Sequence, residues 1–432
     1  MKKNILVLFS LCLASGPAYS DGLSPLETLG KSIFFDANLS INGMQSCASC
    51  HDPAMGFTSP NSEFNATGAV VEGALAGKFG NRKPPSIAYA SESPVLHHIF
   101  DEGDVTFVGG AFLDGRATGR VLGNPTADQA EGPFLNPLEM AMPHKACVVQ
   151  RVLEAKSAGQ YPITLHDVWG AGVPQIDFPA DLAAQCATPG ATIEIADEAT
   201  SAAIDAAFGE IAYAISAYEA SSEVNRFNSR YDHWVAGEGG LNDEERAGLE
   251  MFTREDKGNC AACHVLSPST SGKLAVLTDW TFDNLGVPKN RDNPFYKQAE
   301  ANPDGMGYID PGLGGFLKTD LIYAAYANEN MGRQQVPTLR NLMKGATNGA
   351  PKSFMHNGYF KTLEGVVHFY NTRDILPPCE DEWASEAEAL EKGCWPIAEI
   401  PATVNHDELG NLKLTDTEEH QIVAFMNTLN DE

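Results

Sequence analysis

The sequence has few basic residues for its length. Over 432 residues, 29 Lys and Arg stand against 57 Asp and Glu, and the formal net charge is −28. Nucleic-acid binding needs clustered Lys and Arg side chains that neutralise phosphates, so this balance argues against a nucleic-acid partner. A strongly acidic chain is typical of a well-solvated surface, and it also suits a basic protein partner.

Long hydrophobic runs are missing after the first twenty residues. The basic start "MKK", the apolar run "ILVLFSLCLA" and the small residues around Tyr19 are typical of a signal peptide, for which we expect cleavage after Ser20. The apolar run itself is too short to span a membrane comfortably. The sequence therefore predicts a periplasmic or otherwise exported protein that does not span the membrane.

Alternation of polar and apolar residues with period two is almost absent, which argues against a fold built on sheets. Helical signals are present instead, and several predicted helices begin with a capping box. The capping-box pairs are Ser24 with Glu27, Asn242 with Glu245, and Thr415 with Glu418. Long segments rich in Gly, Pro and Asn separate the helices, so we expect a mainly α fold with extensive coil. Such long loops are expected where they wrap a large prosthetic group.

The chain repeats itself in two similar halves. A predicted helix with a Gly-x-x-x-Phe pair, Gly30 with Phe34 and Gly248 with Phe252, lies ahead of a cysteine motif in each half. Each half also ends in a helical pattern, near residues 199–220 and 414–429. The boundary falls near residue 230, so we expect two domains, 21–230 and 231–432.

The two cysteine motifs are "CASCH" at residues 47–51 and "CAACH" at 260–264. Two cysteines at i and i+3 can form thioethers with the two vinyl groups of one haem, and the following histidine can ligate its iron. The motifs therefore predict two covalent haem c groups, held by Cys47, Cys50, Cys260 and Cys263, with His51 and His264 on the irons. A zinc site or a pair of redox dithiols is the alternative, and the repeat in an exported chain favours haem. Each half is then a cytochrome c-like domain.

Four further cysteines remain after the signal peptide, which is an even number in an oxidising compartment. Sequence neighbours favour disulfides Cys147–Cys186 and Cys379–Cys394. Four cysteines allow three pairings, so the sequence leaves the others open.

The chain resembles the bacterial di-haem cytochrome c peroxidase and MauG superfamily over nearly all of the predicted mature length. The resemblance rests on the order and spacing of the segments "CASCH", "RKPPSIAYA", "GGAFLDGRA", "QAEGPFLNPLEM", "CAACH", "DWTFDNLGVP", "VPTLRNL" and "FMHNGYFKTLEGVVHFYNTRD". In that family the first haem binds peroxide and the second stores or relays an electron. The resemblance thus implies an enzyme that uses hydrogen peroxide.

The second haem needs a ligand on its other face. Residues 362–371 carry a helical pattern whose apolar face is formed by Leu363, Val366, Val367 and Tyr370. The family's peroxidases have methionine fourteen residues after the histidine of a His-Asp-Gly or His-Asn-Gly motif, and MauG-like members have tyrosine. Here His356 is followed at that spacing by Tyr370, so the resemblance implies Tyr370 as ligand. A core tyrosine that only donates a hydrogen bond is the alternative.

The first haem is expected to be open to peroxide. Many peroxidases of the family supply a distal histidine from the loop after the first motif, but residues 52–80 contain none, and His97 and His98 lie beyond it. By resemblance, Glu139 matches the distal glutamate that moves a proton during peroxide cleavage, and Gln129 matches the distal glutamine. Without the resemblance, Glu139 would be taken for a solvated loop acid.

Two positions depart from the family pattern. Leu113 stands where a tryptophan usually lies between the haems, which leaves the electron route open, with Trp280 the nearest tryptophan within a motif. Superfamily members often hold a Ca²⁺ ion between the domains, largely through backbone carbonyls. Lys83 stands where an asparagine is common, so the sequence leaves calcium binding open.

The resemblance implies a MauG-like di-haem peroxidase that forms a high-valent di-haem state and oxidises an external donor, including side chains of a partner protein. One alternative is a conventional peroxidase that draws electrons from a small cytochrome or copper protein. The alternative outside enzymes is a di-haem electron carrier, which needs neither an open iron nor Glu139.

Overall fold

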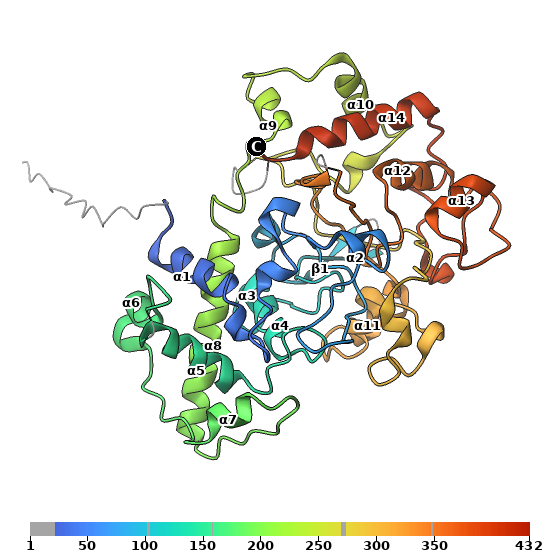
Figure 1. Cartoon of the computed structure of the whole chain (residues 1–432). Helices are drawn as coiled ribbons and strands as arrows, with labels where there is room; N and C mark the ends of the chain where they lie inside the picture. Colours follow the sequence, from blue (N-terminus) through green and yellow to red (C-terminus); the bar gives the residue numbers. More distant parts are fainter. Residues whose placement is uncertain (1–21, 102–103, 158, 269–273, 347–348) are drawn as a thin grey trace, which may run out of the picture.

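The computed structural model describes residues 22–101, 104–157, 159–268, 274–346 and 349–432 (Figure 1). The expected signal peptide, residues 1–20, lies outside the described residues. Within the described ranges, no helix is long and apolar enough to cross a membrane.

Helices dominate the regular structure, with long loops between them, as the sequence predicts. In the first half the helices are α1 (Pro25–Phe34), α2 (Ser62–Ala66), α3 (Pro125–Ala130), α4 (Gly132–Leu135), α5 (Lys145–Ser157), α6 (Leu165–Trp169), α7 (Leu182–Cys186) and α8 (Glu198–Glu219). In the second half they are α9 (Arg230–Val235), α10 (Asp243–Thr253), α11 (Gly312–Leu317), α12 (Leu363–Thr372), α13 (Glu386–Lys392) and α14 (Asp416–Met426). The expected capping boxes are present at the starts of α1, α10 and α14.

The two halves use the same helix pairing. In the first half α1 crosses α8, and in the second half α10 crosses α14. The crossing is close because a glycine stands at the contact in each pair: a Cβ at Gly30 would overlap the carbonyl of Ala214, and a Cβ at Gly248 would overlap the carbonyl of Gln421. The Gly-x-x-x-Phe repeat of the sequence therefore marks a repeated helix crossing, with Phe34 and Phe252 fully buried beside it.

Sheet is limited to two small ribbons in the described residues. Strands β1 (His97–Asp101) and β2 (Asp104–Val108) form an antiparallel hairpin, and β3 (Phe282–Asp283) pairs with β4 (Gln334–Gln335). The sequence analysis does not predict the hairpin, because its strands are short. Residues Ile99 and Phe100 are exposed on it, so the pattern lacks a strong alternation.

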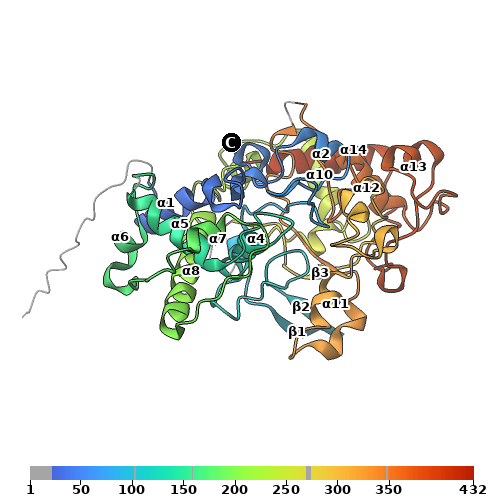
Figure 2. The same ribbon diagram turned by 60° about the horizontal axis from the view of Figure 1, so that its bottom comes forward.

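The helix pairs lie on opposite sides of the molecule. Both views place α1, α5 and α8 on one side, and α10, α12 and α14 on the other, with long loops between them (Figures 1 and 2). Each side has its own buried apolar cluster, and a smaller third cluster around Phe107 and Leu313 lies beneath the hairpin. The site described below lies among the loops between the two large clusters.

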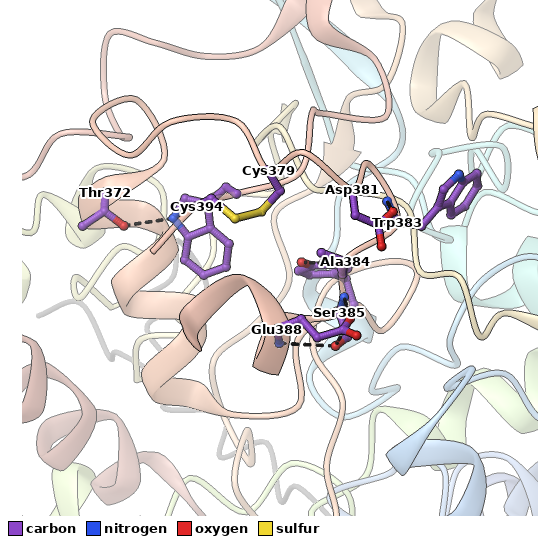
Figure 3. The surroundings of a disulfide bond; sticks show 10 residues. Thr372, Cys379, Asp381, Trp383, Ala384, Ser385, Glu388 and Cys394 are labelled. Atoms are coloured by element: carbon purple, nitrogen blue, oxygen red, sulfur yellow. Dashed lines mark hydrogen bonds between the residues drawn. A yellow bond between two sulfur atoms is a disulfide. The ribbon is translucent and has the colours of Figure 1, made fainter. Parts of the chain in front are cut away.

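Both expected disulfides are present, Cys147–Cys186 and Cys379–Cys394. The second one closes the segment that contains α13 and lies beside α12 (Figure 3). Next to it, the Trp395 indole Nε1 donates a hydrogen bond to the Thr372 hydroxyl at the end of α12, at 3.0 Å. The disulfide therefore secures the segment against which α12 packs.

Removal of each disulfide by paired Cys→Ala substitution is expected to lower stability, and the first pair should cost more. The bridge Cys147–Cys186 has a sequence separation of 39 and Cys379–Cys394 one of 15. Loop-closure entropy predicts losses in the free energy of unfolding of about 4 and about 3 kcal/mol. Thermal unfolding, monitored by circular dichroism, would measure the loss of stability in each double variant. A larger loss for the second pair would mean that native contacts around α12, rather than loop closure, set the cost.

Candidate di-haem site

One continuous cavity of about 480 Å³ reaches both cysteine motifs. Its wall includes Cys47, Cys50 and His51 from the first half and Cys260, Cys263 and His264 from the second half. The cavity is mostly apolar in lining, with a few polar groups that converge on it, which is the usual make-up of a cofactor site. The tertiary structure thus places the two motifs around a shared interior space.

Each motif forms the same short turn. Residues Cys47–Ser49 and Cys260–Ala262 are 3₁₀ turns, and the amide of the following histidine donates to the carbonyl of the first cysteine in both motifs, at 3.0 and 2.8 Å. This turn places two cysteines and one histidine on one wall of the cavity. All four motif cysteines are free thiols, whereas the other cysteines of the described chain are in disulfides.

The two histidines are held in the tautomer that a metal ligand requires. The Nδ1 atom of His51 lies 3.1 Å from the carbonyl oxygen of Phe57, and that of His264 lies 2.9 Å from the carbonyl of Leu277. Donation from Nδ1 to a carbonyl leaves Nε2 with a free lone pair. Burial lowers the pKa of each histidine to about 4, so both rings are neutral at pH 7.

The two residues whose carbonyls bond to the histidines have an unusual backbone conformation. Phe57 has φ of 59° and Leu277 has φ of 58°, a region that residues other than glycine rarely adopt. The same strained geometry in both halves indicates that the histidine orientation is built into the fold.

The described residues fit two c-type haems better than zinc. Within the described chain, no three His, Cys, Asp or Glu side chains gather in a way that could hold a metal ion. A structural zinc site needs four such ligands. Paired free thiols, neutral histidines with oriented Nε2 atoms and a large apolar cavity are the features that covalent haem attachment needs.

Glu139 and Gln129 both line the cavity on the side of the first motif. Gln129 comes from α3, and Glu139 comes from the loop after α4. The Asn136 amide donates to the Glu139 carboxylate at 2.9 Å, and the backbone amide of Ala74 donates to the Glu139 carbonyl at 2.7 Å. Burial raises the pKa of Glu139, and the Arg116 charge opposes that rise. The carboxyl group is thus held in place on the cavity wall, with its pKa above the ordinary value for a glutamate.

Arg116 and Arg340 are two arginines of the cavity wall that could pair with haem propionates, and their surroundings differ. Arg116 lines the cavity, pairs with Asp114 at 2.8 Å and lies over the Phe112 ring at 3.6 Å, with its side chain still 43% exposed. Arg340 is fully buried, and both of its terminal nitrogens donate hydrogen bonds to the Asp232 carboxylate, at 2.7 and 2.8 Å. Arg340 therefore has a structural role in joining α9 to its loop, and only Arg116 keeps a largely free guanidinium.

Tyr370 lies where the helical pattern predicts. It projects from α12 into the cavity near the second motif, on the same face as the buried residues Leu363, Val366 and Val367. None of the described residues accepts a hydrogen bond from its hydroxyl group. Burial raises the pKa of Tyr370 above its ordinary value, so a phenolate would form here only beside a compensating positive charge.

Other candidate ligands for the second haem are less suitable. His368 lies outside the cavity wall and bonds through Nδ1 to the Glu419 carboxylate at 3.1 Å. His356 lines the cavity, but its Nε2 lies 3.2 Å from the Glu399 carboxylate. Met355 also lines the cavity and has a φ of 66°. Of these four residues near the end of the chain, Tyr370 and Met355 therefore remain as candidate ligands.

The structure brings no further histidine to the first motif. Within the described residues, the histidines on the cavity wall are His51, His264 and His356. His97 and His98 lie on β1, where His98 packs against Phe107 and the tyrosines near α11. Their separation from the cavity agrees with a first haem whose distal face is open.

The usual inter-haem tryptophan position is filled by Leu113, which lines the cavity together with Phe112. Trp280 is the one tryptophan of the described chain on the cavity wall. Its carbonyl accepts a hydrogen bond from Gly109 of the first half at 3.0 Å, so it lies at the junction of the halves. The structure thus gives Trp280 a position that the sequence could not supply.

Charged residues that the sequence does not predict as part of the site also line the cavity, among them Glu219, Lys83 and Lys352. Glu219 is buried at the end of α8, and burial raises its pKa to about 8. A signal for it exists, since Glu219 follows Ile215 by four residues and so places a carboxyl group on the apolar face of a predicted helix. The two lysines carry no such signal, because they lie in loops.

Comparison with known proteins identifies the family. A family model described as di-haem cytochrome c peroxidase matches residues 24–240, and the chain belongs to this family. It is 31% identical to the methylamine utilization protein MauG of Paracoccus denitrificans, over 94% of this chain and 88% of that protein. It is 25% identical to the cytochrome-c peroxidase IdrP2 of Denitromonas iodatirespirans, over 82% of this chain and 76% of that protein.

The fold is also that of a solved di-haem peroxidase. The diheme peroxidase BthA from Burkholderia thailandensis, 27% identical, matches with a TM-score of 0.66 over 95% of this chain and 89% of that chain. A variant of BthA in which a tyrosine is replaced by methionine matches with a TM-score of 0.71 at 28% identity, over 94% of this chain and 86% of that chain. The chain is thus a di-haem peroxidase, an oxidoreductase of the c-type cytochrome class that carries two haems.

Proposed function

We propose that this chain is a MauG-like peroxidase of two cytochrome c-like domains, residues 21–230 and 231–432, exported to the periplasm. Hydrogen peroxide reacts at the first haem, held by Cys47, Cys50 and His51. The oxidising equivalents are shared with the second haem, held by Cys260, Cys263, His264 and Tyr370, and are used on an external donor such as side chains of a partner protein.

The observation that carries this proposal is the position of Tyr370. Its hydroxyl group faces the cavity near the second motif and has no described hydrogen-bond acceptor, which disfavours the interpretation as an ordinary core tyrosine. A hydroxyl group that faces the cavity without an acceptor among the described residues is available to a group bound there, and iron ligation would use it. An anionic oxygen ligand favours the higher oxidation states of iron, whereas a neutral thioether favours the ferrous state.

The residues of the first half have separable tasks in this proposal. The haems supply the iron that binds peroxide and the electrons that reduce it. Glu139 moves a proton between the two peroxide oxygens, and the Asn136 amide holds its carboxyl group in place. Gln129 donates from the same side of the cavity and orients the bound peroxide. The apolar remainder of the wall excludes competing water.

A conventional cytochrome c peroxidase is the second candidate. It is favoured by relatives named as cytochrome-c peroxidases, such as the cytochrome c551 peroxidase of Nitrosomonas europaea, 26% identical over 79% of this chain and 71% of that protein. In that case a small cytochrome or copper protein supplies electrons, and Met355 is a candidate thioether on the cavity wall, which Met140 and Met426 also line.

Replacement of Tyr370 separates the two candidates. We expect the ferric protein to show one high-spin and one low-spin haem, and Tyr370→Phe to abolish the low-spin signal, because the phenolate is lost. Tyr370→Met should restore a low-spin haem and raise its reduction potential, because a thioether stabilises the ferrous state. Electron paramagnetic resonance and spectroelectrochemistry measure these changes.

Tyr359→Phe is the matched control for Tyr370→Phe. Tyr359 is a buried tyrosine near the start of α12, but its hydroxyl donates to the Ala384 carbonyl at 3.0 Å and lies off the cavity wall. Its loss should leave both haem spectra unchanged. If the low-spin signal survives in Tyr370→Phe, the ligand is another residue, with Met355 the next to test, and the conventional peroxidase becomes the better assignment.

A further inference from the structure

Two lysines meet at the junction of the halves, on the wall of the cavity. Lys83 comes from the first half, and its backbone amide donates to the His356 carbonyl of the second half at 2.8 Å. Lys352 comes from the second half, is buried, and donates from Nζ to the Met55 carbonyl at 2.5 Å and the Thr58 hydroxyl at 3.1 Å. Burial lowers the pKa of Lys352, and the Lys83 charge lowers it further.

Neither lysine has a carboxylate partner among the described residues. Asp310 and Asp114 are already used by Arg82, the residue before Lys83, which bonds to Asp310 through two nitrogens and to Asp114 through a third, all at 2.6 Å. Within the part of the chain that the structure describes, the Lys83 ammonium donates to the Pro84 carbonyl alone, at 3.4 Å, which is a weak contact. Buried cations without a counter-charge are strongly disfavoured, so this pair needs anions that the polypeptide does not provide.

The same position is unsuited to a calcium ion. Calcium binds six to eight oxygen ligands and prefers carboxylates and backbone carbonyls. Here the Met55 carbonyl and the Thr58 hydroxyl already accept from the Lys352 ammonium group, and Lys83 adds a second positive charge to the same cavity wall. A divalent cation placed there would be repelled by both lysines. The interdomain calcium that the family resemblance raises therefore does not fit these residues.

We propose that Lys83 and Lys352 form a cationic site for the propionate carboxylates of the haems, and that their two ammonium charges stand in place of a calcium ion between the halves. Each haem brings two propionates into the cavity, and charge-assisted hydrogen bonds to ammonium groups satisfy both sides. Because one lysine comes from each half, the site also fastens the halves together. This proposal rests on haem binding, and it does not depend on whether Tyr370 ligates the second haem.

Calcium content of the purified holoprotein is the first test, and it needs no variant. After dialysis against EGTA, elemental analysis by mass spectrometry should find two iron atoms but far less than one calcium per chain. The Tm and the ferric haem spectrum should be the same with EGTA as with added CaCl₂. One calcium per chain whose removal lowers the Tm or alters the spectrum would overturn the proposal.

Charge removal is the second test. Lys83→Met and Lys352→Met in the holoprotein should each lower the midpoint reduction potential of a haem, because a nearby positive charge favours the ferrous state, and should lower the Tm. Lys83→Arg keeps the charge and should keep the potential. Spectroelectrochemistry measures these shifts in potential independently of peroxidase activity. The spectra of the Tyr370 variants test the proposed function separately.

Lys361→Met is the matched control. Lys361 also bridges the halves, with Nζ donating to the carbonyls of Thr67 at 2.5 Å and Gly358 at 2.6 Å, but it lies off the cavity wall. Its loss should lower the Tm without moving either haem potential. Equal potential shifts in all three Lys→Met variants, or none in Lys83→Met and Lys352→Met, would show that the two lysines do not contact the propionates.

Discussion

Glu139→Gln is expected to slow the reaction of the ferric protein with hydrogen peroxide by roughly 10² to 10⁴, the usual loss when a general acid–base is removed. The ferric spectrum should change little, because glutamine can keep the contact with the Asn136 amide that now bonds to the carboxylate. Stopped-flow mixing of the diferric protein with peroxide measures the rate directly.

The pH dependence of that reaction provides a second readout. Burial raises the pKa of Glu139, so the carboxyl group stays protonated to a higher pH than an exposed glutamate, whose pKa is about 4.3. If the carboxylate takes the first proton from peroxide, the rate should fall as the pH drops through this raised pKa. The acid limb of the profile should disappear in Glu139→Gln.

Glu131→Gln is the control for this variant. Glu131 caps the end of α3, and burial raises its pKa as well, but its side chain lies off the cavity wall. Its loss should leave the peroxide rate and its acid limb in place. An unchanged rate in Glu139→Gln would remove Glu139 from the mechanism and make Glu219, a buried glutamate that also lines the cavity, the next residue to test.

The double substitution Cys47→Ala/Cys50→Ala should remove one of two covalent haems and abolish the reaction with peroxide. Without the thioethers, the first haem has lost both covalent attachments, and His51 alone must hold it. Cys260→Ala/Cys263→Ala should remove the other covalent haem and leave a high-spin, peroxide-reactive protein that cannot share oxidising equivalents. The pyridine haemochrome assay counts covalent haem in each variant.

Substitution of the Cys147–Cys186 pair provides the control for nonspecific loss of haem. These cysteines are buried in a disulfide away from the cavity, so their replacement should cost stability but leave two covalent haems per chain. Zinc in place of iron, or haem that extracts into acid acetone from the unmodified protein, would contradict the interpretation of both motifs.

Local patterns in the sequence are sufficient to predict several features. The helix starts at Ser24, Asn242 and Thr415 are predictable because a capping box is a contact between residues three apart. The inward face of α12, with Tyr370 on it, follows from the helical period. The turn of each cysteine motif is local too, and the structure places both motifs on a cavity wall as haem attachment requires.

Features that join distant segments are decided by the tertiary structure alone. The shared cavity depends on loops from both halves, and no periodicity encodes which loops meet. Lys83 and Lys352 line the same cavity although 269 positions separate them, and the Trp280 carbonyl accepts a hydrogen bond from Gly109 at the junction of the halves. The pairing of Arg340 with the Asp232 carboxylate likewise joins two segments that are far apart in the sequence. Sequence patterns report what a residue does within its own helix or turn, whereas charge pairing across the cavity depends on how the halves pack.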